Sequence, residues 1–338
     1  MTQEFSDKAA ASAEGTAPTK QRLAWLDAAR GVALLAMAIY HFTWDLDYFG
    51  YIAPGTAATG GWRIFARLIA GSFIFLAGFS LALGHRNAIR WRPFWHRFGR
   101  IAAAALLITT ATYFIFPSTF IFFGILHHIA LASLLGLFFL RLPLVVLPMV
   151  AAAQFAAPQF LRSELFNIPA LWWVGLSETA PRSNDYVPLL PWFGAFLLGM
   201  TVSRLWIARA AKVSTGPATR APGRTTSLFA MAGRHSLAVY LIHQPLLIAL
   251  VYLATQVAPP PKPDPVESYR RSCVAACSVD TDAAFCKSFC DCTISELQSR
   301  NLFDALNAGT LNVQTDERIA ELSQQCTARA FSDAPSPQ

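Results

Sequence analysis

An arginine and a histidine bound an apolar segment that reads Arg30-Gly31-Val32-Ala33-Leu34-Leu35-Ala36-Met37-Ala38-Ile39-Tyr40-His41. At 3.6 residues per turn, Asp27, Arg30, His41 and Asp45 fall within a helical arc of about 60°. An ionisable group is costly inside a membrane helix, so each one there is a candidate functional residue. We therefore predict a membrane helix that turns this polar face toward other helices or a wet cavity.

The composition is that of a membrane protein. Hydrophobic residues make up 54% of the chain and charged residues only 14%, against about 25% charged in soluble proteins. Since a span needs about twenty apolar residues, we predict an all-α, polytopic transmembrane bundle of about seven spans. The third and fifth are the shortest of these predicted spans, which are Leu23–Phe42, Trp62–Leu83, Ile101–Phe116, Phe120–Leu140, Leu142–Ala157, Val187–Trp206 and Leu228–Val257.

The distribution of lysine and arginine predicts the orientation, because cytoplasmic connections are enriched in both. One set of connections holds Lys8, Lys20, Arg22, Arg86, Arg90, Arg92, Arg97, Arg100, Arg141, Arg204, Arg209, Lys212, Arg220 and Arg224. The opposite set holds few beyond Arg63, Arg162 and Arg182. We expect residues 1–21 to be a cytoplasmic polar tail and the C-terminus to lie outside, in the periplasm of a bacterial inner membrane. The net charge of +7 then reflects topology and does not indicate nucleic-acid binding.

A proline-rich linker, residues 258–266, separates the predicted transmembrane domain, residues 22–257, from a Cys-rich tail, residues 267–330. The tail holds all six cysteines of the chain. A nested arrangement would pair Cys273 with Cys290, Cys277 with Cys286 and Cys292 with Cys326, although six cysteines allow fifteen connectivities. A thiolate zinc site is the alternative. We favour disulfides and no metal, because the predicted topology places this short tail, which we expect to be helical, in an oxidising compartment.

Arginines near the ends of the spans are candidate ligand-binding residues. Arg97 and Arg100 lie one helical turn apart at the membrane edge and are suited to hold a phosphate group. Arg63 and Arg67 enter the second span from the other side. They could neutralise Asp45 or Asp47, or line the mouth of a cavity.

Several polar or aromatic residues inside the spans are candidates for lining a cavity. His127 and His128 point about 100° apart on a helix, so at most one is expected to face the site. His243 could form a helix-to-helix hydrogen bond or take part in the site. The full set of candidate cavity-lining residues is Asp27, Arg63, Arg67, His127, Trp192, His243 and Gln244.

Five blocks together resemble bacterial proteins that carry the heparan-α-glucosaminide N-acetyltransferase catalytic domain. The similarity extends over Arg22 to Val257, and the order of the blocks is more specific than any one of them. The chain also resembles the wider group of membrane acyltransferases that modify bacterial surface glycans. This resemblance lies in Arg30-Gly31 followed by His41, together with Arg97 and Arg100. The blocks are Leu26 to His41, Ala77-Gly78-Phe79-Ser80-Leu81, Phe123-Gly124-Ile125-Leu126-His127, Pro188 to Gly194, and Gly233 to Pro245.

The resemblance implies an enzyme that transfers an acyl group, acetyl from cytoplasmic acetyl-CoA, to a sugar amine or hydroxyl on the other side of the bilayer. Acetyl-CoA would be a co-substrate, and no permanently bound cofactor is implied. Arg30, Arg97 and Arg100 would hold the donor phosphates. His41 would act as general base or transient acyl carrier, with Asp45 orienting its imidazole.

One departure from the family pattern concerns the catalytic histidine. In the eukaryotic lysosomal enzyme this histidine lies in the loop after the first span, and the position of His41 is an asparagine. Here no histidine occurs between Phe42 and His85.

A non-enzymatic small-solute carrier or membrane scaffold is the competing function, since paired buried charges are also expected in such proteins. The chain shows no convincing internal repeat of the kind many carriers have.

Overall fold

The computed structural model describes residues 23–213, 224–261, 264–278, 281–311 and 316–333. Every regular element in these residues is a helix, so the predicted all-α class is confirmed. The predicted tail 1–21 and the cations Lys8, Lys20, Arg22 and Arg220 lie outside the described residues. By its internal contacts the chain divides after Val257 into two units.

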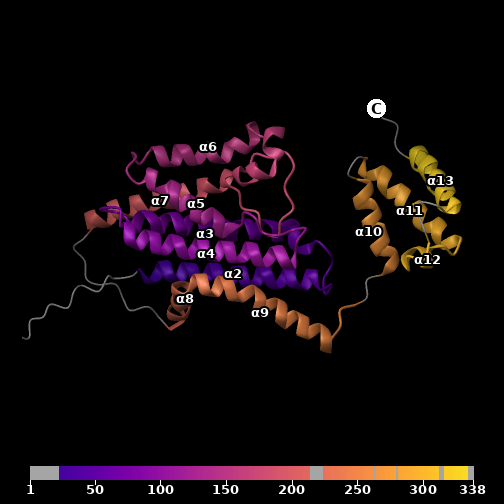
Figure 1. Cartoon of the computed structure of the whole chain (residues 1–338), viewed down its shortest axis with the longest axis horizontal. Helices are drawn as coiled ribbons and strands as arrows, with labels where there is room; N and C mark the ends of the chain where they lie inside the picture. The colour runs from indigo at the N-terminus through magenta and orange to yellow at the C-terminus, as the bar shows by residue number, and fades with distance from the viewer. Residues whose placement is uncertain (1–22, 214–223, 262–263, 279–280, 312–315, 334–338) are drawn as a thin grey trace, which may run out of the picture. The chain divides into compact units, whose positions relative to one another are not determined.

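The described residues of the first unit form eight α-helices. Figure 1 shows a bundle of elongated helices with α9 running alongside α2. Short 3-10 turns occupy the connections before α3 and before α7. The helices are α2 (Ala24–Tyr48), α3 (Gly60–Gly84), α4 (Trp91–Ile115), α5 (Ile125–Phe139), α6 (Val146–Phe160), α7 (Leu189–Val213), α8 (Arg224–Arg234) and α9 (Ser236–Val257).

Four described helices are long and apolar enough to cross a membrane: α3, α4, the Leu189–Arg209 part of α7, and α9. Helices α5 and α6 are apolar but have only 15 residues each. Helix α2 has 25 residues and carries the polar face predicted from the sequence. The chain is therefore an integral membrane protein.

Two predicted span boundaries are wrong. The third span is predicted at Ile101–Phe116, with a start as early as Phe94 allowed, but α4 begins earlier still, at Trp91. Pro93 lies in the first turn, where the missing N–H has no helical acceptor to lose, so the charged stretch before Ile101 can be helical. The seventh segment, Leu228–Val257, is two helices that meet around His235.

Helices α3 and α7 cross at two reciprocal glycines and form the centre of the bundle. A Cβ atom on Gly78 would overlap the backbone carbonyl of Phe196, and one on Gly199 would overlap that of Phe75. Small residues let membrane helices approach this closely. The main core surrounds this crossing, with Ile74, Leu81, Phe196, Leu197 and Met200 almost fully buried.

Helix α2 packs against α8 with equally close backbone contact. A Cβ on Gly31 would overlap the Phe229 carbonyl, and one on Gly233 would overlap the carbonyl of Asp27. Helix α9 continues beside the remainder of α2. Two consecutive helices therefore cover the length of α2.

The glycine at the α3–α7 crossing should not tolerate a methyl group. We expect Gly199→Ala to destabilise the protein by about 1–3 kcal/mol, because backbone atoms of Phe75 must move. The matched control is Gly99→Ala on α4, where no atom lies within 4 Å of the added Cβ. Thermal unfolding in detergent compares the two variants, and equal midpoints would contradict the close crossing.

In the part of the second unit that the structure describes, four helices are present: α10 (Pro265–Cys277), α11 (Ala283–Ser299), α12 (Phe303–Asn307) and α13 (Glu317–Asp333). Asp264 caps α10 and Asp282 caps α11, each through a side-chain oxygen that accepts backbone N–H bonds. A small apolar core is formed by Leu297, Leu302, Phe303, Leu322 and Cys326.

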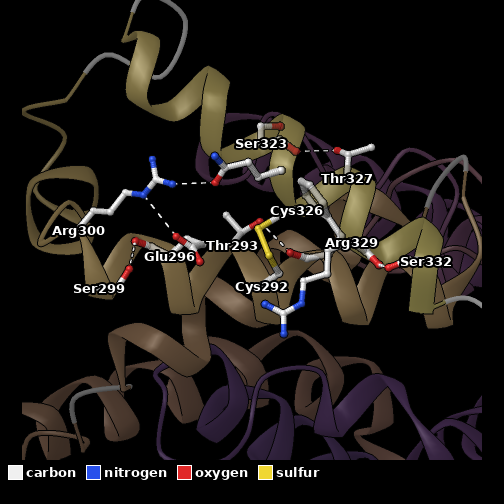
Figure 2. Close-up of a disulfide and its surroundings, with 12 residues drawn as sticks. Cys292, Thr293, Glu296, Ser299, Arg300, Ser323, Cys326, Thr327, Arg329 and Ser332 are labelled. Atoms are coloured by element: carbon white, nitrogen blue, oxygen red, sulfur yellow. Dashed lines mark hydrogen bonds and ion pairs between the residues drawn. A yellow bond between two sulfur atoms is a disulfide. The ribbon is translucent and has the colours of Figure 1, made fainter.

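Three disulfides connect these helices in the nested arrangement: Cys273–Cys290, Cys277–Cys286 and Cys292–Cys326. All six cysteines are bonded, so no thiolate is available for the alternative zinc site. Figure 2 shows Cys292 and Cys326 joining α11 to α13, with Arg300 and Glu296 paired nearby on the α11 side.

The Cys292–Cys326 bridge should contribute most of the stability of the α11–α13 contact. Replacing both cysteines by alanine is expected to cost about 2–4 kcal/mol, as for other bridges that close long loops. Limited proteolysis of the purified full-length protein should then cut within residues 299–318 much faster. Ser295→Ala, an exposed position on α11, is the control, and unchanged cleavage of the double variant would refute the expectation.

Candidate functional site

Two helices far apart in sequence, α2 and α9, bring together four of the candidate residues. We call His41 and Asp45 of α2 with His243 and Gln244 of α9 the α2–α9 seam. The rings of His41 and His243 lie with their centroids 5.0 Å apart. The Gln244 Nε2 donates a hydrogen bond to Asp45 Oδ1 at 2.8 Å.

The His243 ring is held by its own helix. Its Nδ1 lies 2.7 Å from the Tyr240 carbonyl oxygen, and since a carbonyl only accepts, Nδ1 carries the proton. The other ring nitrogen, Nε2, is buried and has no hydrogen-bond partner. His243 therefore offers a lone pair on the edge of a ring whose tautomer is fixed.

The expected contact between Asp45 and the His41 imidazole is not formed. Asp45 is completely buried, and its hydrogen-bond partner is Gln244 on the other helix. The neighbour of the His41 ring on α9 is His243. The helical spacing of His41 and Asp45 placed them correctly on one face, but the sequence could not show that α9 lies opposite.

A second group, which we call the arginine cluster, consists of Arg30, Arg97 and Arg100. Arg97 is close enough to both other arginines for a direct electrostatic interaction. Arg30 Nη1 is 3.0 Å from Asp27 Oδ1, and its Nη2 donates to Ser80 Oγ. The cluster therefore combines α2 and α4, as a shared anion site requires.

Asp27 anchors this end of α2. Its side chain is 6% exposed and interacts with Arg30 and, at 3.8 Å, with Arg234 of α8. Ser80 and Arg234 were not selected from the sequence as site residues. Their positions in two of the family-like blocks, Ala77–Leu81 and Gly233–Pro245, were the signal that pointed to them.

His127 belongs to a structural hydrogen-bond chain. Its Nδ1 accepts from the Gly124 N–H, and its Nε2 lies 3.1 Å from Thr109 Oγ1, which donates to the Ile121 carbonyl. His127, Asp185 and Tyr240 meet around a space too small for a water molecule. His127 therefore lines no open cavity, and adjacent His128 is fully buried.

The remaining candidates lie apart from both groups. Arg63 and Arg67 are exposed, and in the described part of the chain no ion pair or hydrogen bond joins either to Asp45 or Asp47. The Asp47 carboxylate instead accepts backbone N–H bonds from the connection after α2, at Gly55 and Ala57. Trp192 packs on the main core.

Asp185 is a polar residue that sequence reasoning did not single out. It lies in the connection before α7 and accepts a hydrogen bond from the backbone N–H of Ile125, the first residue of α5, at 2.9 Å. Two backbone bonds, Asn184 N to Thr119 O and Val187 N to Phe123 O, hold the two connections together. Burial raises the pKa of the Asp185 carboxyl to about 6, against the effect of the Ile125 bond.

Comparison with known proteins gives one match. Residues 22–245 match the family model described as heparan-alpha-glucosaminide N-acetyltransferase, catalytic. No curated protein and no solved structure matches the chain. The matched range includes the arginine cluster and the seam, and it ends directly after Gln244.

The raised pKa of Asp185 predicts a pH-dependent stability. Native Asp185 binds its proton up to a pH of about 6, whereas the unfolded carboxyl loses it near 3.8. The stability that this group contributes is therefore present at low pH and is lost as pH rises from about 4 to 6. Asp185→Asn keeps an acceptor for Ile125 N–H without the charge.

We expect the thermal midpoint of Asp185→Asn, relative to the wild type, to rise by about 3–6 °C between pH 4.5 and 7. Thermal unfolding in detergent across this range measures the difference. Glu178→Gln, at an exposed position in the same connection, is the control and should show no such trend. If the difference in thermal midpoint between Asp185→Asn and the wild type does not change with pH, the carboxyl of Asp185 titrates normally.

Proposed function

Because the chain belongs to the heparan-alpha-glucosaminide N-acetyltransferase catalytic family, we propose that it transfers an acetyl group from acetyl-CoA to a sugar amine or hydroxyl across the membrane. Family membership supports acyltransferase activity in general. The identity of the donor, the identity of the acceptor and the roles of individual residues are what we propose beyond this. The observation that carries it is that α2 contributes a residue to each group: Arg30 to the arginine cluster and His41 to the seam.

The arginine cluster is the proposed donor site. Three guanidinium groups next to one another repel unless an anion lies among them, and guanidinium forks suit phosphate oxygens. Among the described residues, Arg30 pairs with the carboxylate of Asp27, and no carboxylate pairs with Arg97 or Arg100. Acetyl-CoA carries several phosphates, and we assign them to Arg30, Arg97 and Arg100.

The seam is the proposed acceptor site. His41 follows Arg30 by eleven residues, which corresponds to about 16 Å along the helix axis. An extended donor can therefore contact the arginine cluster and present its thioester toward His41. The acceptor nitrogen or oxygen attacks the thioester carbonyl, the carbon–sulfur bond breaks, His41 takes the acceptor proton, and the thiolate leaves. Transient acylation of His41 is the two-step variant of the same reaction.

The orientation is part of the proposal. Five arginines precede or begin α4 on the side that we assign to the cytoplasm, where acetyl-CoA is available. They are Arg86, Arg90, Arg92, Arg97 and Arg100. The second unit would then lie in the periplasm of a bacterial inner membrane. Three disulfides in that unit support an oxidising location.

A membrane scaffold or solute carrier is the second candidate. The specific observation in its favour is that Asp27 pairs with both Arg30 and Arg234, as charges that only hold helices together would. A scaffold has no reason to bind acetyl-CoA. Donor binding therefore separates the two functions before the acceptor is known.

The test measures acetyl-CoA binding and turnover in proteoliposomes with glucosamine and crude surface glycan as acceptors. We expect Arg97→Ala/Arg100→Ala to weaken donor binding by at least about tenfold, the usual effect of losing charged hydrogen bonds. His41→Ala should bind the donor normally and lose turnover. The matched control is Arg90→Ala/Arg92→Ala, two exposed arginines at the same end of α4.

Absence of donor binding by the wild type would refute the acetyltransferase. Full turnover by His41→Ala would refute the role of His41 while leaving the activity established. If donor binding is weakened equally in the two arginine double variants, general positive charge attracts the donor and the arginine cluster has no specific role.

A further inference from the structure

The side chains of Asp45 and Gln244 leave two buried oxygens that face no donor. Asp45 Oδ1 accepts from Gln244 Nε2 at 2.8 Å. Asp45 Oδ2 and Gln244 Oε1 are both buried and neither has a hydrogen-bond partner. Among the described residues no cation forms an ion pair with Asp45. One carboxylate is thus held by a single neutral hydrogen bond.

An ionised carboxylate in this position would be strongly unfavourable. A buried charge without a partner loses its hydration without compensation, and a buried amide oxygen without a donor adds a further desolvation cost. Asp45 has no exposed surface, and both unpaired oxygens are themselves inaccessible. A water molecule, metal ion or substrate ammonium group would need space at these atoms, whereas a proton needs none.

One proton on Asp45 Oδ2 satisfies both oxygens. The carboxyl becomes neutral, its O–H becomes a donor, and Gln244 Oε1 becomes the acceptor. A carboxylic acid and a primary amide each present one donor and one acceptor on the same edge. They can therefore form two parallel hydrogen bonds, of which the structure already contains the Nε2 to Oδ1 bond.

We propose that Asp45 is a protonated carboxylic acid paired with Gln244 through two hydrogen bonds, and that this pair is a positioning device that holds His41 opposite His243. The second part rests on the proposed function. Asp45 lies one turn after His41 on α2, and Gln244 follows His243 on α9. Locking Asp45 to Gln244 therefore fixes the register in which the two histidine rings meet at 5.0 Å.

The neutral pair also determines what His41 can do. A carboxylate one turn away would stabilise a charged imidazolium, which cannot accept a proton from an acceptor. A neutral acid does not. The His243 Nε2 lone pair has no hydrogen-bond partner among the described residues and belongs to the ring next to His41.

The first test is spectroscopic and does not depend on acetyl transfer. The infrared spectrum of the full-length wild type in lipid near neutral pH should contain a carboxylic-acid carbonyl band that is lost in Asp45→Asn. Asp47→Asn, two residues along the same helix, is the control and should retain the band. Absence of the band from the wild type, or its persistence in Asp45→Asn, would overturn the protonated state whether or not the protein is an acetyltransferase.

The second test is rescue by a matched side chain. Asparagine at position 45 can form the same two bonds with Gln244, whereas leucine forms neither. Asp45→Leu and Gln244→Leu should each lower turnover by at least about tenfold, and Asp45→Asn should recover it to within about threefold of the wild type. Donor binding should be unaffected in all three. If Asp45→Asn is as inactive as Asp45→Leu while donor binding persists, His41 needs a charged carboxylate and the positioning role is wrong.

Discussion

The constraint on which the first unit depends is the polar face of α2. A helix in an apolar bundle can carry Asp27, Arg30, His41 and Asp45 only if each finds a partner on a neighbouring helix. Arg234 of α8 and Ser80 of α3 meet the Arg30 end, and His243 and Gln244 of α9 meet the other end. The close α2–α8 packing at Gly31 and Gly233 follows from the same requirement, because short side chains reach their partners only when the backbones approach.

The two ends of α2 satisfy their polar groups by different means. At the Arg30 end charges predominate, with more guanidinium groups than carboxylates, which favours an anionic ligand. At the His41 end the groups are imidazoles, an amide and a carboxyl, and several of their acceptor atoms have no donor among the described residues. This difference between the two ends of α2 suits a reaction in which the charged part of the donor binds at the Arg30 end and a proton is transferred at the His41 end.

The helical class and the polar face of α2 could be predicted from the sequence because both depend on local spacing, whereas the family was predicted from the resemblance of five sequence blocks. The sequence also placed Arg97 and Arg100 one turn apart, although α4 begins earlier than hydropathy suggested, since a charged, Trp-rich first turn has low hydropathy and is still helical. Partners were harder to predict. Asp45 joins Gln244 across 199 positions of sequence, and Asp185 reaches Ile125 across 60; such contacts are set by helix packing, which no local pattern encodes. For Arg63 and Arg67, charge suggested either a pairing with Asp45 or Asp47 or a place at the mouth of a cavity; both arginines are exposed, and among the described residues no ion pair joins either to these carboxylates.

The nested disulfides of the second unit have a consequence for its covalent connectivity. Helix α11 supplies one cysteine to every bridge, with Cys286 and Cys290 bonded backward to α10 and Cys292 bonded forward to α13. Any single backbone cut between Cys273 and Cys290, or between Cys292 and Cys326, leaves both fragments joined by at least one bridge. Between Cys273 and Cys326, the two peptide bonds that flank Asp291 are the ones that no bridge encloses, and they lie inside α11, where a protease has the least access. Nearly every nick between Cys273 and Cys326 therefore leaves the two fragments covalently joined.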